Sequence, residues 1–488
     1  MAGNSTRRIL GPFNRVEGDL EVQVEIDEGR IESAWVNSPL YRGFEQILVG
    51  KDPRDALVIT PRICGICSVS QSVAAARALA DAQGIEQTPN GLLATNLILA
   101  CENVADHLSH FYLFFMPDFA RSDYAEHAWH RDAAERFVAQ KGSASRDMLP
   151  ARSEWMHITG LLAGKWPHSL ALQPGGTTRA IEPREKLRLQ SIVAGFRRFL
   201  ETTLFADKLE NVAAIATEDE LMAWAGQHAG GDFAHFVRIA ASAGLAKLGR
   251  ATDHFMSYGA YATGHPNETH RFESGIWFDG RRESFEQRAI TEDISHAWMH
   301  AQRTPKHPFD GSTLPDADIA DAYSWCKAPR YNGRVFEVGA VARQLIDGHP
   351  LIAELVTNGG GNVFSRVVAR LLELARVVPM MEGWIKAIAI GETFCNQGKL
   401  PKDGEGVGLV EAARGSLGHW LQIKHGRILN YQIVAPTTWN FSPRDQDDVP
   451  GALEQALIGT EVGDNGKQTV SIQHIVRSFD PCMVCTVH

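Results

Sequence analysis

The chain has 488 residues, of which 44% are hydrophobic and 22% charged, with no low-complexity tract or visible repeat. This composition is typical of a globular protein that buries a large core. A formal net charge of -10, without a Lys/Arg cluster interleaved with aromatic residues, argues against a nucleic-acid partner. No apolar run is long enough for a membrane span or follows the basic N-terminus as in a signal peptide, so we expect a cytoplasmic chain, or one exported only with a partner.

The first predicted element is a β-hairpin near the N-terminus. Apolar residues alternate with polar ones from Leu20 to Ile26, a turn follows at 27–29, and the alternation resumes at Ile31. The next stretch, "SVSQSVAAARALADAQG", is rich in alanine and ends at Gly84. It predicts a helix with Cys67 at or near its start.

A long helix is predicted next. Thr88 is a good cap, Pro89 suits the first helical position, and apolar residues recur with helical spacing as far as a stop at Pro117. The helix should contain about 28 residues and be about 40 Å long.

The remaining elements complete the predicted fold. Helical patterns cover 183–210, 351–356 and 364–378, section 258–280 reads as irregular or strand-like, and 419–436 predicts a hairpin that turns at His425 and Gly426. Length alone suggests about three domains, but no linker separates the parts. We therefore expect one α+β domain over 1–488, mainly helical, with a central bundle of long helices and small antiparallel sheets near both termini.

Four of the seven cysteines form two CxxC pairs, Cys64 with Cys67 and Cys482 with Cys485. Seven cysteines in so long a chain do not make a disulfide framework. Two such pairs are compatible with structural zinc, with a redox or iron-sulfur role, or with a catalytic metal. Structural zinc sites usually join pairs a few tens of residues apart, whereas more than four hundred residues separate these pairs, which favours a catalytic metal.

Several polar residues lie in sequence contexts that suit a catalytic site. Glu17 precedes the first predicted strand, Asp106 and His110 are one helical turn apart, Arg414 stands before a glycine, and Asp480 precedes the second cysteine pair. Each also has a structural explanation, because an Asp and a His at this spacing are more often a helix pair and an Arg before Gly often anchors a loop. Their occurrence together with both cysteine pairs favours a functional role.

The motifs carry a specific resemblance over nearly the whole chain. The chain resembles the large subunit of nickel-iron hydrogenases. The two cysteine motifs that carry this resemblance are "RICGIC" and "SFDPCMVCTVH". The other motifs, in the order of the family, are "GPFNRVEGDLEV", "YRGFE", "DHLSHFY", "SWCKAPRY", "ARGSLGHW" and "PTTWNFSPRD". The related quinone-site subunits of respiratory complex I generally lack the cysteine set. The four cysteines therefore decide in favour of the hydrogenases.

The resemblance implies a nickel-iron centre that cleaves dihydrogen into two protons and two electrons. All four thiolates would bind nickel, Cys64 and Cys482 as terminal ligands, while Cys67 and Cys485 would also bridge to an iron that carries carbon monoxide and two cyanides. Heterolysis of so weak an acid needs a polarising metal and an adjacent base. By resemblance, Cys482 is that base and Glu17 receives the proton.

The same resemblance assigns supporting groups. Arg414 would lie over the open metal position, with Asp106 and Asp480 orienting it. A Mg²⁺ site completed by waters would use Glu45, His488 and the main-chain carbonyl of Val434. The three remaining cysteines, Cys101, Cys326 and Cys395, cannot build a cluster that takes about four ligands, so a small subunit with iron-sulfur clusters is implied as partner.

Departures from the common family pattern indicate a subtype. Gln71 stands where the family pattern has His, and Ile66 and Phe114 fall where the gas tunnel narrows and resemble the bulkier pair of hydrogen-sensing regulatory members. The chain also ends at His488 without an extension. These features favour a sensor that signals to a histidine kinase. A respiratory uptake hydrogenase that feeds quinone or cytochrome is the alternative, and a non-catalytic zinc protein is a third.

Overall fold

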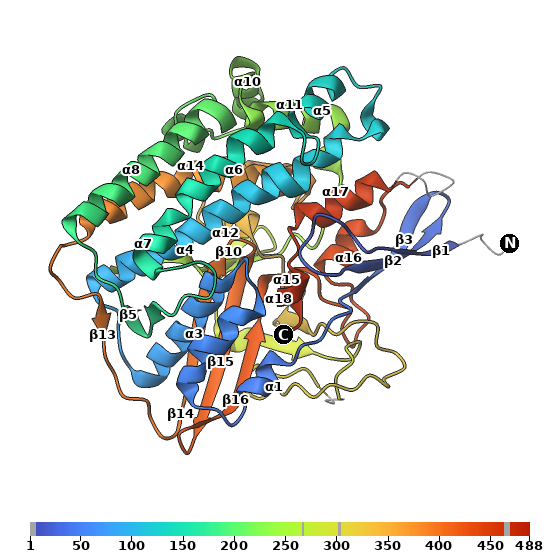
Figure 1. Ribbon diagram of the computed structural model, residues 1–488. Coiled ribbons are helices and arrows are strands. Elements are labelled where there is room, and N and C mark those ends of the chain that lie inside the picture. Colours follow the sequence, from blue (N-terminus) through green and yellow to red (C-terminus); the bar gives the residue numbers. More distant parts are fainter. Residues whose placement is uncertain (1–5, 266–267, 301–303, 463–468) are drawn as a thin grey trace.

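A computed structural model describes residues 6–265, 268–300, 304–462 and 469–488. The chain combines helices with antiparallel sheets, which confirms the mixed class. In Figure 1 the long helices α4 (Pro89–Ser109), α8 (Pro183–Phe199) and α14 (Val363–Ala387) lie together above the C-terminal sheet, and the N-terminal sheet projects to the right.

The N-terminal sheet contains the predicted hairpin and one further strand. β1 (Thr6–Leu10), β2 (Glu21–Asp27) and β3 (Arg30–Asn37) pair antiparallel in that order. Glu28 and Gly29 form the two-residue turn with φ of 46° and 77°, the left-handed geometry that matches strand twist. The hairpin is confirmed, whereas β1 was not predicted because its sequence does not alternate.

The predicted helix after the first cysteine pair is confirmed. Cys67 is the residue before α3 (Ser68–Gln83), and Gly84 ends the helix in the left-handed conformation with φ of 63°. This helix covers the C-terminal sheet of β14 (Gly404–Ala412), β15 (Gly415–Lys424) and β16 (Arg427–Val434), which contains the second predicted hairpin with its turn at 425–426.

Helix α3 approaches strand β14 unusually closely. A Cβ atom at Gly408 would lie 1.8 Å from the carbonyl oxygen of Ala74, and one at Gly406 would lie 2.0 Å from that of Ala78. Only glycine on the strand permits this contact. The close packing fixes the start of α3, and with it Cys67, against the sheet that carries Arg414.

The long helix α4 begins as predicted but changes its hydrogen-bonding pattern before Pro117. The Thr88 hydroxyl caps it by accepting from Gly91 N at 3.1 Å. After Ser109 the chain continues as a π-helical turn, η3 (His110–Phe115), and a 3-10 turn, η4 (Met116–Ala120). The Phe114 carbonyl accepts from Arg15 Nη1 at 3.1 Å, so a side chain contacts the backbone where the regular helix is lost.

Other predicted helices differ in length. Segment 183–210 is α8, a π-helical turn η6 (Leu200–Leu204) and α9 (Leu209–Ala213) rather than one helix. The helix predicted at 351–356 extends over α13 (Pro350–Gly359). The one predicted to end at 378 continues through Pro379 to the end of α14. The remaining α-helices are α1 (Phe44–Leu48), α2 (Ala56–Ile59), α5 (His130–Phe137), α6 (Ser143–Trp155), α7 (His157–Ala163), α10 (Glu218–Gln227), α11 (Asp232–Ala243), α12 (Ala340–Ile346), α15 (Pro436–Asn440), α16 (Ala452–Leu457), α17 (Val470–Ser478) and α18 (Met483–Thr486).

Small sheets also occur in the middle of the chain, so sheets are not confined to the two ends. Section 258–280, apart from 266–267, which lie outside the described residues, is largely strand. The strands of these middle sheets are β4 (Leu172–Gln173), β5 (Gly175–Thr177), β6 (Phe255–Ser257), β7 (Ala260–His265), β8 (Glu268–Phe272), β9 (Gly275–Phe278), β10 (Arg281–Glu283), β11 (Ile290–Asp293), β12 (Ala328–Tyr331) and β13 (Cys395–Asn396).

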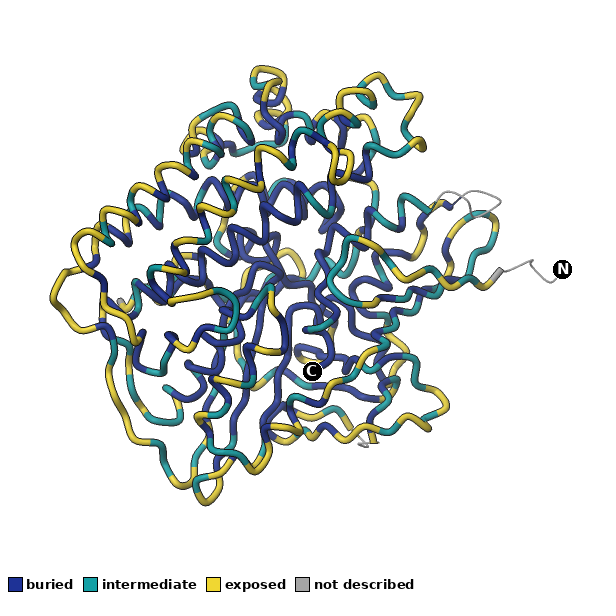
Figure 2. The backbone as a smooth tube through the Cα atoms, viewed as in Figure 1, coloured by how far each residue is buried: buried dark blue, intermediate teal, exposed yellow. Residues whose placement is uncertain are grey.

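One large apolar cluster includes buried residues from Leu20 to Cys485. Figure 2 shows that the C-terminal segment lies inside the molecule, and His488 is only 6% exposed. The single domain over 1–488 stays a prediction that this shared core supports. Over the described residues, the helices are too short or too polar to cross a bilayer.

Candidate metal centre

The four cysteines of the two CxxC pairs meet at one buried point. Cys64 Sγ lies 3.4 Å from Cys482 Sγ, Cys67 Sγ lies 3.0 Å from Cys485 Sγ, and Cys482 Sγ lies 3.3 Å from Cys485 Sγ. All four sulfurs lie within 4.8 Å of one another and are free thiols. Among the described residues, no other three or more His, Cys, Asp and Glu side chains converge in this way.

Short turns hold each pair. Cys64 is extended at the end of a 3-10 turn, η2 (Thr60–Ile63), and Cys67 directly precedes α3, while Cys482 directly precedes α18. Ile66 N donates to Cys64 Sγ at 3.2 Å. The residue before α3 and the residue before α18 therefore each carry a thiol that faces the other pair.

The pKa values of the thiols indicate that the four sulfurs need a cation between them. Hydrogen bonds from the neighbouring thiols, Cys482 first, lower the pKa of Cys64 well below its ordinary value. The neighbouring thiols, Cys482 first, raise the pKa of Cys67, and burial together with these thiols raises the pKa of Cys485. Four thiolates this close therefore require a cation between them. Soft sulfur donors suit nickel and iron, so the residues present fit such a centre.

Arg414 occupies the two-residue turn between β14 and β15. Its Nη1 lies 3.0 Å from Asp106 Oδ2, its Nη2 lies 3.1 Å from Asp480 Oδ1, and its Nε donates to the Asp480 carbonyl at 2.8 Å. Gly415 follows with φ of 126°, and a Cβ there would lie 2.7 Å from Gly339 N. The glycine after the arginine is thus required by the backbone and the close packing.

Arg414 and its two partners, Asp106 and Asp480, are all buried. Burial opposes the charge on Arg414, but Asp106 and Asp480 raise its pKa well above the ordinary value, so the guanidinium stays charged. Burial raises the pKa of Asp106, whereas at Asp480 the effect of burial is outweighed by Arg414 and the pKa is lowered. Neither oxygen of Asp106 makes a well-directed hydrogen bond, so its contact with Arg414 is mainly electrostatic.

Glu17 lies beside the second cysteine pair through the backbone. Met483 N donates to the Glu17 carbonyl at 2.7 Å, and the segment pairs in parallel with Cys482. Glu17 is half-buried, and burial, followed by the neighbouring Cys64, raises the pKa of its carboxyl. The arginines Arg414 and Arg42 oppose this rise. A carboxyl with a raised pKa holds a proton more readily than an exposed glutamate does.

Arg42 is a site residue that the sequence analysis missed. Its Nη2 donates to the carbonyl of Ile63 at 2.6 Å and also to the carbonyl of Val484. These two residues directly precede Cys64 and Cys485, so one guanidinium connects both cysteine loops. The block "YRGFE" was the available signal, but nothing in it indicates this long-range contact.

Gln71 is buried and accepts a hydrogen bond from His419 Nε2 at 2.8 Å. The other ring nitrogen, Nδ1, faces the Tyr431 hydroxyl at 2.8 Å. Because the amide oxygen can only accept, Nε2 carries the proton and Tyr431 donates to Nδ1. Burial lowers the pKa of His419 to about 3, so the ring is neutral in this chain of hydrogen bonds.

The predicted magnesium ligands Glu45 and His488 do meet, at 3.6 Å between Oε1 and Nε2. The carbonyl beside them belongs to Ile433, which accepts from His488 Nε2 at 2.5 Å, while Ile433 N donates to Glu45 Oε1 at 2.7 Å. The carbonyl of Val434 as a magnesium ligand stays a prediction, and the carbonyl that contacts His488 is that of the preceding residue, Ile433. Adjacent residues of a strand direct their backbone groups to opposite edges, and Val434 pairs with Gly418 of β15.

Lys327 and Glu292 complete this buried cluster and were also missed. Lys327 Nζ lies 3.3 Å from Glu45 Oε2, 3.4 Å from Glu292 Oε2 and 2.6 Å from Gln432 Oε1. Burial would raise the pKa of Glu45, but Lys327 and His488 hold it at about 2. Glu45 is thus an ionised carboxylate.

Three further predicted residues take separate positions. His110 donates Nε2–H to the Arg477 carbonyl at 2.6 Å, and burial lowers the pKa of its ring to about 3. Ile66 lies between the first two cysteines and is half-buried, as is Phe114 in η3. A gas tunnel at Ile66 and Phe114 stays a prediction.

Comparison with known proteins agrees with this geometry. The family model described as nickel-dependent hydrogenase matches residues 42–147 and 124–488. The periplasmic [NiFeSe] hydrogenase large subunit of Desulfomicrobium baculatum is 30% identical over 98% of this chain and 94% of its own length. The uptake hydrogenase large subunit of Afipia carboxidovorans is 28% identical over 99% and 95%.

The fold is also that of solved structures. The reduced Ni-Fe-Se hydrogenase of D. vulgaris Hildenborough superposes with a TM-score of 0.84 at 28% identity, covering 99% of this chain and 100% of that one. In the present chain the site contains sulfur, since all four positions are cysteine.

Proposed function

Because this chain belongs to the nickel-dependent hydrogenase family, as a large subunit of an oxidoreductase that acts on dihydrogen, we propose that its four thiols hold a nickel-iron centre. The observation that carries this proposal is the convergence of four free thiols within 4.8 Å. All four would bind nickel, with Cys67 and Cys485 also bridging to an iron that carries carbon monoxide and two cyanides. When bound, such a centre supplies the electrophile that polarises dihydrogen.

The protein supplies the bases. We assign Cys482 as the group that takes the first proton and Glu17 as the group that carries it outward. The backbone pairing of Glu17 with Cys482 and the raised pKa of the Glu17 carboxyl support this route, because transfer requires adjacent groups of suitable pKa. The two electrons leave through a partner subunit.

Arg414 is assigned as a fixed cation over the site. Its two carboxylate partners, Asp106 and Asp480, keep it charged and in one orientation, so it needs no reorganisation during the reaction. Its position at a turn whose glycine cannot be replaced without a clash supports this role.

A Mg²⁺ ion at Glu45, His488 and the Ile433 carbonyl is part of the proposal. Glu45 is an ionised carboxylate, His488 Nε2 lies 3.6 Å from its Oε1, and the Ile433 carbonyl lies 2.5 Å from the same nitrogen. These oxygen and nitrogen atoms, gathered at one buried point, would be the protein ligands, and water would complete the coordination.

For the subtype, we propose a hydrogen sensor in the cytoplasm. It would bind and slowly oxidise dihydrogen with an iron-sulfur small subunit and signal to a histidine kinase. The motivating residues are Gln71, Ile66 and Phe114. The buried contact between Gln71 and His419 supports a role for Gln71 in orienting a neutral imidazole, one helical turn after Cys67.

The second candidate is an uptake hydrogenase that feeds quinone or cytochrome, favoured by the relative named an uptake hydrogenase. Turnover of the purified heterodimer separates the two candidates, because an uptake enzyme should be fast and a sensor slow. Deletion of the gene for this chain tests the two candidates independently. Loss of hydrogen-dependent transcription in the deletion strain supports the sensor. Loss of hydrogen-driven respiration supports the uptake hydrogenase and contradicts the sensor.

Metal analysis tests the centre itself. We expect nickel and iron in the heterodimer, with infrared bands from iron-bound carbon monoxide and cyanide. Zinc without nickel or these bands would show that the cysteines form a structural site and would overturn the proposal.

A further inference from the structure

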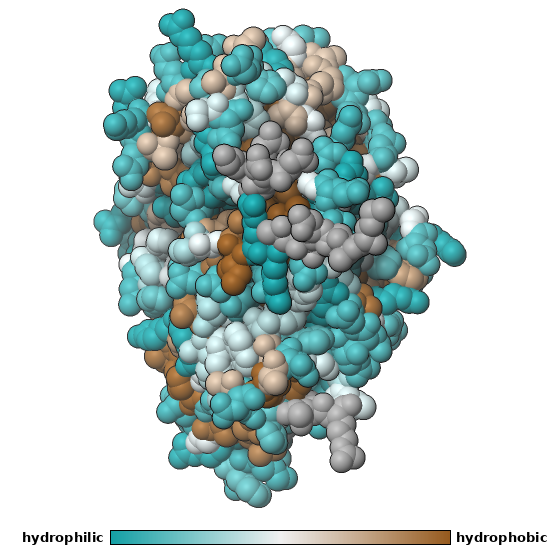
Figure 3. All heavy atoms as spheres, turned by 90° about the vertical axis from the view of Figure 1, so that its right-hand side faces the viewer, coloured by the Kyte–Doolittle hydropathy of each residue, from teal (hydrophilic) through white to brown (hydrophobic). Residues whose placement is uncertain are grey.

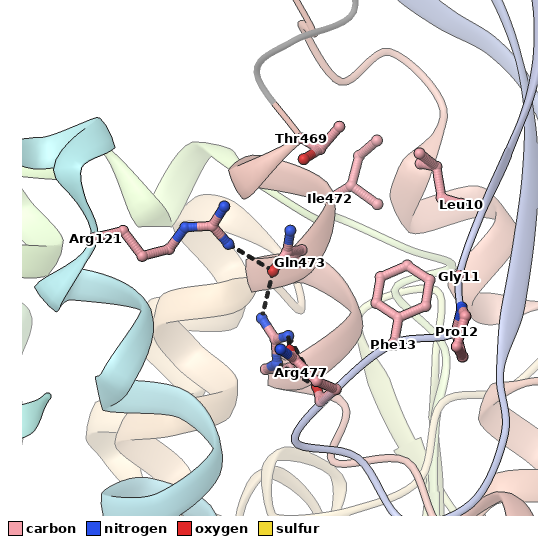
Figure 4. A pocket seen from close by; sticks show the side chains of 10 residues that line it. Leu10, Gly11, Pro12, Phe13, Arg121, Thr469, Ile472, Gln473 and Arg477 are labelled. Atoms are coloured by element: carbon pink, nitrogen blue, oxygen red, sulfur yellow. Dashed lines mark hydrogen bonds between the residues drawn. The ribbon is translucent and has the colours of Figure 1, made fainter. Parts of the chain in front are cut away.

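A cavity of about 290 Å³ lies at the surface between the segment after β1 and helix α17, on the right-hand side of Figure 1. Its walls combine apolar and cationic side chains (Figure 4): Leu10, Phe13, Arg121, Ile472, Gln473 and Arg477. Its chemistry is therefore that of a pocket for an anionic group with an apolar stem.

Positive charge is in excess around this pocket. Three arginines surround the fully buried Asp118: Arg15 and Arg477 form ion pairs with it, and Arg121 Nη1 lies 3.8 Å away. Arg121 also pairs with Asp123, so the cluster holds three cations and two carboxylates. Burial lowers the pKa of Arg477 to about 10, and the neighbouring Arg15 and Arg121 contribute to this shift.

The group that lies between Arg121 and Arg477 is a neutral amide, that of Gln473. The Gln473 amide oxygen accepts from Arg121 Nη1 at 2.8 Å and from Arg477 Nη1 at 3.0 Å (Figure 4). A carboxylate is a much stronger partner for two guanidinium groups than an amide. The N–H groups of Arg477 are all paired within the chain, with Asp118, Gln473 and Asn14. Among the described residues, Arg121 Nη2 has no acceptor, because Arg121 bonds Gln473 through Nη1 and Asp123 through Nε. Arg121 therefore keeps N–H donors for a further carboxylate.

The position of the pocket suggests what fills it. Its two walls, 10–14 and 469–477, lead directly into Glu17 and Cys482, and Arg477 Nη2 ties them together by donating to the Asn14 carbonyl at 2.9 Å. The adjacent Ile9 is 68% exposed. Figure 3 shows this face as mainly hydrophilic, with apolar side chains exposed both near its middle and along its lower left.

We propose that this pocket receives an acidic side chain of the iron-sulfur small subunit. This inference rests on the proposed function, which requires such a partner to take electrons close to the metal segments. The side-chain carboxylate would pair with Arg121 at the mouth of the pocket, and its methylene groups would lie against Phe13 and Ile472.

The test uses the full-length chain expressed with a tagged small subunit. Gln473→Glu gives the two arginines a carboxylate from within the chain, and Arg121→Ala removes one donor. Both changes should weaken subunit association by about tenfold or more. Retention on the tag would be measured as salt is raised. The control is Arg188→Ala, which removes a surface arginine of α8 whose partner is Glu154.

The unfolding midpoint of the isolated Gln473→Glu chain separates docking from folding, and it should stay the same or rise. Association unchanged in both variants would overturn the inference. Binding of inorganic phosphate or self-association that depends on Arg121, with normal small-subunit retention, would also overturn it. Nickel content is measured in the same preparations, so a chain that holds nickel but docks normally refutes the pocket and leaves the proposed function standing.

Discussion

Arg42 shows how a single side chain can define a site that is made from distant parts of a sequence. Its guanidinium reaches the residues before Cys64 and Cys485, which are more than four hundred positions apart. Sequence patterns identified the cysteines, Glu17 and Arg414 because each lies in a recognisable motif. They could not identify Arg42, because its role depends on which main-chain carbonyls the fold brings within its reach.

We expect Arg42→Ala to lose most of the bound nickel and Arg42→Lys to lose part of it. An ammonium is a point donor and cannot hold two carbonyls in the fixed geometry of a guanidinium. Nickel per chain in the purified protein is the measurement. Arg54→Ala, which removes only an exposed pair with Asp52, is the control and should retain its nickel. Full nickel in Arg42→Ala would refute this role.

Gln71→Leu should lower the free energy of unfolding by about 1–3 kcal/mol, because the buried His419 N–H loses its acceptor. Gln71→Glu keeps an acceptor and, since a nearby carboxylate stabilises the protonated ring, should raise the pKa of His419. Urea unfolding and titration of the imidazole by NMR measure these effects. An unchanged stability in Gln71→Leu would mean that the hydrogen bond contributes nothing.

At the scale of elements, the predictions succeeded where local chemistry decides. Thr88 caps α4, and the turns at 28–29 and 425–426 adopt the left-handed geometry that their residues favour. They failed where tertiary contacts decide. The π-helical turn after Ser109 lies where Arg15 donates to the Phe114 carbonyl, and β1 depends on its pairing with β2.

The contact of α3 with β14 gives a test at this scale. Gly408→Ala places a methyl group 1.8 Å from the Ala74 carbonyl and should cost about 3 kcal/mol or more, because helix or strand must move. Gly160→Ala in α7 has no atom within 4 Å and should be neutral or stabilising. Urea unfolding compares the two. Equal free energies of unfolding for Gly408→Ala and Gly160→Ala would show that α3 and β14 can move apart without loss of stability.

At the scale of the whole molecule, buried neutral histidines make the fold sensitive to acid. Burial lowers the pKa of His110 and His419 to about 3 and that of His474 to about 4, whereas the unfolded value is about 6.5. Below pH 6.5 the unfolded chain therefore binds more protons than the folded one. Stability is fully present above about pH 6.5 and falls as the pH falls toward 4.

His474→Phe should reduce this acid dependence, because it removes one of the three groups and keeps a ring stacked on Phe119, which now lies 4.7 Å from the imidazole centroid. The loss of the contact with Tyr124 lowers stability by a similar amount at each pH. Unfolding free energies between about pH 7 and 5 measure the slope. His425→Gln, at an 84% exposed site, should leave it unchanged. Equal slopes in all three proteins would contradict the assignment.

The joining of residue 17 to residue 482 by backbone pairing has a consequence for how the molecule is made. During synthesis the first two thiols are made more than four hundred residues before Cys482 and Cys485. A chain interrupted between the two pairs holds only half of the thiol set. The four-thiol site can therefore form only after the segment that contains Cys482 has been made and has paired with residue 17.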